Sequence, residues 1–295
     1  MIPPEGLHGG DGPAIAKALG LDPATILDLS QSLNPFAPDV EALAARHLSS
    51  LTHYPDPGDG ERSLAAAIGV DPDRLVLTNG GSEAIAIVVA EVGGTVAAEP
   101  EFSLHPRSEG GPRWSSNPRN PTGLLAADHE RADVWDEAFF PLATGAWTRG
   151  DRDAIVVGSL TKVFACPGLR LGYVIADEAA AIGRRRPEWS VNALALAVLN
   201  DLLDRSDLPA WSAAIASARD DLRALLAAHG LVADPSDAAW VLVRAPGLRN
   251  RLAPHGVVVR GCAGFGLPDH VRIAVPDADG LARLGTALER SSDAT

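Results

Sequence analysis

The chain has 295 residues, 46% of them hydrophobic and 21% charged, so it is long enough for a large core and two unequal lobes. Its formal net charge of -13 argues against a nucleic-acid or anionic-membrane partner, because both require a basic surface. Two cysteines, Cys166 and Cys262, are too few for a disulfide framework or a cysteine-based metal site, and no metal is expected. The first residues lack the charged and apolar regions of a secretion signal, and no apolar run could span a bilayer, so we expect a cytoplasmic protein.

Near the start of the sequence, the run His8-Gly9-Gly10 precedes an expected helix over 14–19. Asp11 is a plausible N-cap of this helix, and Gly20 is the expected stop. A histidine followed by two glycines lets backbone amides approach an anion, although a flexible leader would have the same composition.

A strand, a glycine turn and a helix follow at 75–78, 79–81 and 82–90. This arrangement points free backbone amides at a phosphate, and Gly81, Ser82 and Glu83 are the candidate donors. A plain strand-to-helix turn would look much the same, so the pattern needs support from elsewhere in the chain. Just before it, Tyr54 lies in a proline-fixed extended segment, where a tyrosine is usually half-buried packing.

The middle of the chain carries an asparagine and an aspartate at expected strand ends. Asn120 precedes a Pro-Thr-Gly turn and could donate its amide to a phenolate oxygen. Asp136 follows Val134-Trp135, and a carboxylate at a buried strand end is costly unless it meets a cation or a donor.

One lysine lies between two apolar segments, 154–157 and 171–176, both of which we expect to be strands of a buried parallel sheet. Burial would depress the pKa of Lys162 and free its amine to react with a carbonyl group. Arg170, with the hydroxyls of Ser159 and Thr161, suits a phosphate monoester. The alternative is an ordinary strand corner whose lysine points at water.

The last third predicts helices over 193–203, 208–228 and 277–288, and short strands over 239–243, 257–260 and 271–275. Arg260 and Arg272 fall on two of these strands, where a rigid guanidinium could hold a carboxylate or a phosphate. Edge-strand arginines that serve solubility are the alternative.

The run Ser159-Leu-Thr-Lys162, followed by Pro167-Gly-Leu-Arg-Leu-Gly-Tyr173, closely resembles the cofactor-lysine signature of fold-type I pyridoxal-phosphate (PLP) enzymes. More narrowly, it resembles the branch holding histidinol-phosphate aminotransferases and threonine-phosphate decarboxylases. The matches run in order from His8 to Arg272. The resemblance implies an α/β fold with a mostly parallel central sheet in a large domain, 50–205. It also implies a small α+β domain made of 206–295 and of 1–49 with its N-terminal arm.

The resemblance also assigns roles around the cofactor. Lys162 would attach to PLP, Asp136 would pair with the pyridine nitrogen, and Asn120 would donate to the phenolic oxygen. Gly81, Ser82, Glu83, Ser159, Thr161 and Arg170 would hold the cofactor phosphate. His105 would stack on the pyridine ring, with a surface histidine as the alternative. Tyr54 would bind the neighbouring subunit's cofactor phosphate, which requires a homodimer.

Substrate contacts follow from the same resemblance. Arg272 would take the substrate α-carboxylate and Arg260 would lie near its phosphate. The remaining substrate contacts would come from His8, Gly9, Gly10, Asn34 and Asn192.

The middle of the chain departs from the family. Eleven residues separate His105 from Asn117 and twelve separate Gly123 from Asp136, intervals in which relatives fit an extra strand and helices. We expect the missing pieces to be mostly outer-layer helices, so that the sheet is retained with one face thinly covered.

The expected reaction is decarboxylation of L-threonine O-3-phosphate, a small anionic amino-acid phosphate, to (R)-1-amino-2-propanol O-2-phosphate in cobalamin synthesis. His8-Gly-Gly, His105 and Trp189-Ser-Val-Asn192 favour this choice by resemblance. An aminotransferase of the histidinol-phosphate type shares the scaffold and is the first alternative. A cofactor-binding protein that lost turnover with its shortened middle is the second.

Overall fold

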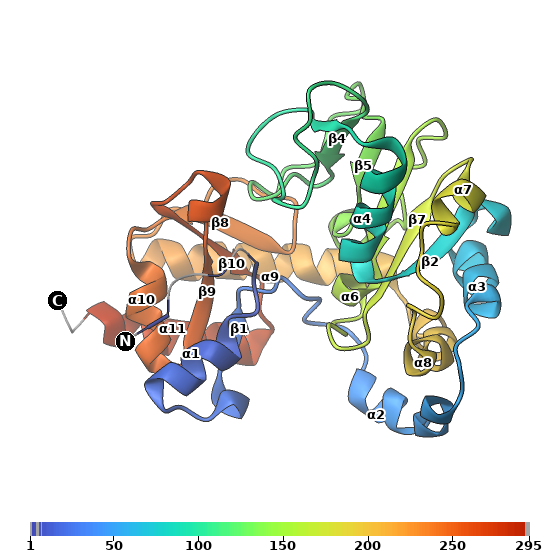
Figure 1. The fold of residues 1–295 in the computed structure, drawn as a ribbon. Coiled ribbons are helices and arrows are strands. Elements are labelled where there is room, and N and C mark those ends of the chain that lie inside the picture. Colours follow the sequence, from blue (N-terminus) through green and yellow to red (C-terminus); the bar gives the residue numbers. More distant parts are fainter. Residues whose placement is uncertain (1, 4–5, 7, 293–295) are drawn as a thin grey trace.

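The computed structural model describes residues 2–3, 6 and 8–292, which form two lobes joined by a long helix, α9 (Leu208–Ala228) (Figure 1). The larger lobe is built on a six-stranded sheet with the order β2-β7-β6-β5-β4-β3. Its strands are β2 (Leu75–Asn79), β3 (Thr95–Val96), β4 (Arg113–Ser116), β5 (Val134–Asp136), β6 (Ile155–Ser159) and β7 (Leu171–Ile175).

Strands β3 to β6 pair in parallel, whereas β7 is antiparallel to both of its neighbours, β2 and β6. The prediction that 171–176 is a strand is confirmed, but its placement in a parallel pairing is wrong. The physical reason is the short connection between β6 and β7, which holds only the four-residue helix α6 (Leu160–Val163) and a turn. A parallel return would require a crossover of about a dozen residues or more, usually with a full helix.

Helices cover both faces of this sheet. The helices of the larger lobe are α2 (Val40–Ala45), α3 (Gly58–Ile68), α4 (Gly80–Val92), α5 (Phe140–Thr144), α6, α7 (Ala179–Gly183) and α8 (Ala193–Leu203). On one face Ile85 and Val88 of α4 pack with Trp114 of β4. On the other, Leu199 of α8 packs with Leu77 of β2.

The shortened middle leaves the sheet intact and covers it with loops. Strand β3 ends at Val96, and the chain folds back so that Arg107 forms an antiparallel bridge with Thr95 at the edge of the sheet. On one face the buried ring of Trp135 is covered by Arg149, whose Cζ lies 5.0 Å from the ring centroid. The returning chain and this arginine therefore shield part of the surface that we expected to be thinly covered.

The smaller lobe contains a four-stranded sheet with the order β1-β9-β10-β8. Its elements are β1 (Leu27–Leu29), β8 (Trp240–Arg244), β9 (Val257–Gly261), β10 (His270–Ala274), α1 (Gly12–Leu19), α10 (Leu248–Leu252) and α11 (Ala278–Ser292). Strand β1 pairs in parallel with β9, and β10 is antiparallel to β8 and β9. Both ends of the described chain therefore belong to this lobe (Figure 1).

Several local predictions can be compared with this fold. Helices α8 and α9 begin and end where the sequence predicted. Asp11 precedes α1 but makes no side-chain cap; its carboxylate pairs with Arg249 at 3.1 Å. The expected small domain included 1–49, yet Leu43 of α2 is buried in the core of the larger lobe, because α2 packs against α8. Within the described residues, no helix is both long and apolar enough to cross a membrane.

Candidate active site

A cavity of about 300 Å³ is lined by residues of both lobes, a size suited to a small-molecule site. Its wall includes most of the residues that the sequence proposed. These are His8, Gly9, Gly81, Ser82, Asn120, Asp136, Ser159, Thr161, Lys162, Arg170, Arg260 and Arg272. They come from segments as far apart in the sequence as 8 and 272, so the fold brings them together.

Lys162 lies in the short helix α6, directly after β6. Its Nζ donates to the main-chain oxygen of Gln31 at 3.1 Å. Burial, followed by the positive charges of Arg272 and Arg170, lowers the pKa of Lys162 to about 8. An amine with this pKa is partly uncharged near neutral pH, which a nucleophile toward a carbonyl carbon requires.

An anion cup forms where β2 turns into α4. Gly80 has a φ of +77°, and a Cβ there would overlap the guanidinium of Arg170. Arg170 itself has a φ of +56°, a left-handed conformation that is costly for a residue other than glycine and concentrates at functional sites. Ser82 lies in the first turn of α4, whose free amides carry positive potential. Guanidinium, hydroxyls and helix terminus together fit a phosphate ester.

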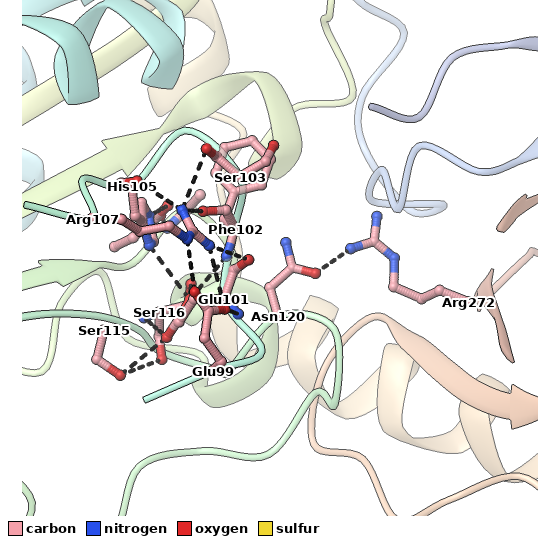
Figure 2. A network of polar contacts seen from close by, with 12 residues as sticks. Glu99, Glu101, Phe102, Ser103, His105, Arg107, Ser115, Ser116, Asn120 and Arg272 are labelled. Atoms are coloured by element: carbon pink, nitrogen blue, oxygen red, sulfur yellow. Dashed lines mark hydrogen bonds and ion pairs between the residues drawn. The ribbon is translucent and has the colours of Figure 1, made fainter. Parts of the chain in front are cut away.

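Asp136 ends the buried strand β5 and lines the cavity. Its Oδ1 accepts a hydrogen bond from the amide of Ala138 at 3.0 Å, and its Oδ2 lies 2.9 Å from Nε2 of His105. Asn120 lies on the same wall, and its Oδ1 accepts from Nη1 of Arg272 at 2.6 Å (Figure 2). That bond leaves the Asn120 amide nitrogen available to donate toward a phenolic oxygen.

His105 does not occupy the place that the sequence suggested. Its ring is buried behind Asp136 and is not part of the cavity wall, so it is not positioned to stack on a ring held there. Within the same segment, the aromatic side chain that does line the wall is Phe102, whose ring lies 5.5 Å from that of His8; Phe139 and Phe265 line other parts of the cavity. Sequence reasoning missed Phe102, although an aromatic residue three positions before His105 was visible.

Other predicted residues also lie away from the cavity wall. Asn192 caps α8 by accepting from the amide of Ala195 at 2.8 Å, and its amide nitrogen donates to Leu169 at 2.7 Å. Asn34 is buried and donates to the main-chain oxygen of Val163 at 2.9 Å, beneath the lysine segment. Both side chains are engaged in holding the backbone, and neither lines the cavity.

Three further residues that the sequence predicted as cofactor or substrate contacts also do not line the cavity. The Glu83 carboxylate accepts a hydrogen bond from the amide of Asn79 at 2.6 Å and so stabilises the turn between β2 and α4. The amide of Gly10 donates to Ser30 at 2.8 Å. Tyr54 is 81% exposed and its ring lies 4.8 Å from that of Trp189, on the outside of the chain.

Two arginines of the smaller lobe face each other on paired strands. Arg260 of β9 and Arg272 of β10 are cross-strand partners, both are buried, and both line the cavity. Their guanidinium carbons lie over aromatic rings, 5.2 Å from Phe265 and 4.8 Å from Trp240 respectively. Burial and the neighbouring Arg260 lower the pKa of Arg272. Like charges directly opposite on a sheet repel, so this pair is suited to a site for anionic groups.

The two-lobed α/β fold and a buried lysine between an anion cup and a carboxylate define a PLP-dependent enzyme of fold type I. Comparison with known proteins agrees. The family model for aminotransferase class I and II matches residues 115–288. Histidinol-phosphate aminotransferase 1 of Thiobacillus denitrificans is 30% identical, with 93% of this chain and 87% of that protein aligned. The chain belongs to the class I and II aminotransferase family, which confirms the expected fold class and PLP as the cofactor.

Solved structures show the same fold. Histidinol-phosphate aminotransferase of Sinorhizobium meliloti, in complex with pyridoxal-5′-phosphate, has a TM-score of 0.80 at 19% identity and covers 96% of this chain and 95% of its own. L-threonine-O-3-phosphate decarboxylase of Porphyromonas gingivalis has a TM-score of 0.76 at 22% identity, covering 90% and 99%. Fold similarity alone does not separate the two reactions.

The alignment to the Thiobacillus enzyme also bears on the shortened middle. It runs over 336 residues, more than the 295 of the whole chain, so the relative carries insertions that this chain lacks.

Proposed function

We propose that this protein decarboxylates L-threonine O-3-phosphate to (R)-1-amino-2-propanol O-2-phosphate, as a step of cobalamin synthesis. The observation that carries this choice is the buried pair Arg260 and Arg272, which adds two fixed cations to the one that Arg170 offers at the anion cup. Threonine phosphate has a carboxylate and a phosphate, and so presents one anion to each arginine. In histidinol phosphate a methylene phosphate ester stands in place of the carboxylate, so the phosphate is its single anionic group.

The cofactor fits the residues on the larger-lobe wall. Lys162 would bind its carbonyl carbon, Asp136 its pyridine nitrogen, and Asn120 its phenolic oxygen. Gly81, Ser82, Ser159, Thr161 and Arg170 would hold its phosphate. When bound, PLP supplies an acceptor for the electron pair released at the substrate Cα. The phenyl ring of Phe102 would flank the pyridine ring, in the role that the sequence assigned to His105.

The chain's own groups then select which bond breaks. Arg272 would hold the α-carboxylate and Arg260 the phosphate, so that the substrate is fixed at two points and Cα is presented in one orientation. Lys162, with its lowered pKa, lines the same cavity and would hold or return a proton at that carbon. The ring of Phe139, whose centroid lies 5.7 Å from the Lys162 Nζ, adds an apolar surface that keeps the amine poorly solvated.

Aminotransfer of the histidinol-phosphate type is the second candidate, and the names of the aligned relatives favour it. Besides the Thiobacillus protein, histidinol-phosphate aminotransferase 2 of Pseudomonas aeruginosa is 29% identical, with 88% of each chain aligned. The arginine pair would also accept the two carboxylates of 2-oxoglutarate, so the pair alone does not exclude this reaction. A cofactor-binding protein without turnover would have no use for two buried cations in the cavity.

We also propose that the active form is a homodimer. Tyr54 is exposed and does not line its own chain's cavity, and its ring, tilted against that of the exposed Trp189, leaves an uncovered aromatic surface. A second copy that covers this surface would receive the Tyr54 hydroxyl at its cofactor phosphate.

The deciding experiment supplies the PLP-loaded protein with threonine phosphate and no keto acid, and measures carbon dioxide and aminopropanol phosphate. We expect stoichiometric release. Glutamate formed from 2-oxoglutarate with histidinol phosphate, without carbon dioxide, would instead identify an aminotransferase.

Arg272→Gln should abolish turnover. Arg244→Gln is the matched control, because Arg244 lies on the same sheet, is exposed and pairs with Asp269 at 3.1 Å. If the cofactor attaches but neither substrate is turned over, both the decarboxylase and the aminotransferase assignments are wrong.

A further inference from the structure

A second buried carboxylate lies behind the cavity, in the segment that leads to His105. Glu101 is 4% exposed. Its Oε1 accepts from the amide of Ser116 at 2.8 Å and from the hydroxyl of Ser115 at 3.3 Å (Figure 2). Its Oε2 accepts from the Ser116 hydroxyl at 2.5 Å and from the amide of Phe102 at 3.2 Å. Both oxygens act only as acceptors, as an ionised carboxylate does.

His105 lies between this carboxylate and Asp136. Its Nε2 is 2.9 Å from Oδ2 of Asp136, and its Nδ1 is 3.4 Å from Oε2 of Glu101. Nδ1 is buried and has no hydrogen-bond partner among the described residues, so a protonated ring would meet Glu101 there as an ion pair. The rings of Phe102 and Trp114, at 5.7 and 5.5 Å, cover the imidazole. A neutral imidazole can donate from only one nitrogen, whereas an imidazolium serves a carboxylate on each side.

The charges around the imidazole favour its protonated form. Burial alone would lower the pKa of His105, but the hydrogen bond that it donates to Asp136 and its interaction with the Glu101 carboxylate raise it to about 9. The nearby Arg107 does not oppose this: its Nη1 bonds the main-chain oxygen of His105 at 2.8 Å, and its Nε pairs with Glu99 at 2.7 Å. With a neutral His105, two carboxylates would face each other across a dry space.

We propose that Glu101 is a positioning residue that holds His105 as an imidazolium and thereby fixes the carboxylate of Asp136. Strand pairing ties the three groups together, because Ser116, which anchors Glu101, is the cross-strand partner of Asp136. One oxygen of Asp136 is held by the Ala138 amide and the other by His105, so its carboxylate cannot rotate freely. This inference rests on the proposed function only in naming the pyridine nitrogen as the group that Asp136 faces.

The consequence is a fixed charge behind the cavity. Glu101, His105 and Asp136 together carry one negative charge for as long as the imidazole stays protonated. An added pyridinium would then neutralise the set. Loss of the imidazolium proton would leave two negative charges and would change both the orientation and the field of Asp136.

The test is a pH titration of His105 by NMR, with isotope-labelled histidine, in the PLP-loaded protein and in the cofactor-free protein. His105→Gln identifies the signal. We expect the imidazolium signal to persist to about pH 9 in the wild type. In Glu101→Gln the midpoint should fall by at least about one unit, a tenfold loss of proton affinity. Glu99→Gln is the matched control, because Glu99 is a more exposed carboxylate paired with Arg107, and it should leave the midpoint unchanged.

A neutral His105 at pH 8 in the wild type, or an unchanged midpoint in Glu101→Gln, would overturn the proposal. If Glu101→Gln does not fold, the wild-type titration still decides, and Glu101→Asp should retain the imidazolium. In the turnover assay, the alkaline limb of kcat/KM should move down with the midpoint in Glu101→Gln while KM changes little. The NMR result does not depend on the substrate, so it stands or falls separately from the decarboxylase assignment.

Discussion

The lowered pKa of Lys162 makes a quantitative prediction about its reactivity. With a pKa of about 8, roughly a quarter of the amines are uncharged at pH 7.5, against about one in a thousand for an ordinary lysine. Burial is the largest cause, and the charge of Arg272 is the next. Arg272→Gln removes that charge and should raise the pKa of Lys162. The uncharged fraction near neutral pH should then fall by roughly three- to tenfold.

The chain offers an internal control for this measurement. Its only lysines are Lys17 and Lys162, and Lys17 is exposed on α1. Trace acetylation of the cofactor-free protein between pH 6 and 11, followed by mass spectrometry of the two peptides, gives a labelling midpoint for each amine. Restricted access would slow labelling of Lys162 at every pH without moving its midpoint.

We expect the Lys162 midpoint near 8 and an upward shift in Arg272→Gln, with Lys17 measured in the same samples as the reference amine. Coincident midpoints for the two lysines would refute the reasoning from burial. A normal Lys162 midpoint together with full cofactor attachment would show that the amine is activated only after PLP enters.

Three other predictions follow from single residues. Burial raises the pKa of Glu137 to about 7, so the folded state holds a proton that the unfolded chain releases near pH 4.5. The contribution of Glu137 to stability should therefore fall by about 3 kcal/mol as pH rises from 4.5 through 7, and urea titrations should find a difference of this size between the pH dependence of the wild type and that of Glu137→Gln. Gly80→Ala should displace Arg170 and weaken PLP binding by about tenfold or more in a fluorescence titration, and unchanged affinity would contradict the anion cup. Tyr54→Phe should remain dimeric by sedimentation but bind PLP about fivefold more weakly, as loss of one hydrogen bond predicts; a monomeric wild type would exclude the shared site.

Local patterns predicted most of the wall that carries the chemistry. Lys162, Arg170, Ser82 and Asp136 stand at strand ends or at the start of a helix, where the adjoining strand fixes where a side chain goes. Helix α9 was recognised to its ends because its apolar face and its Pro209 are visible in the sequence.

The errors concern choices that depend on partners distant in the sequence. His105 and Phe102 are both aromatic and only three residues apart, and which of them faces the cavity depends on the carboxylate of Asp136, about thirty positions later. An asparagine at position 192 suits a helix cap as well as a substrate contact. In the structure, the Asn192 side-chain oxygen accepts a hydrogen bond from the backbone amide of Ala195, so it acts as the cap. The direction of β7 follows from the length of its connection to β6, which is too short for the crossover that a parallel pair requires.

The parallel pairing of β1 with β9 sets the order in which the smaller lobe can form. Residues 27–29 leave the ribosome well before their hydrogen-bonding neighbours, 257–259, which lie more than two hundred positions later in the chain. Until those neighbours emerge, β1 is an unpaired edge and Leu29 has no core to enter. The larger lobe, whose strands all lie between 75 and 175, can assemble during translation, whereas the arginine-bearing sheet must wait until 257–274 have been synthesised.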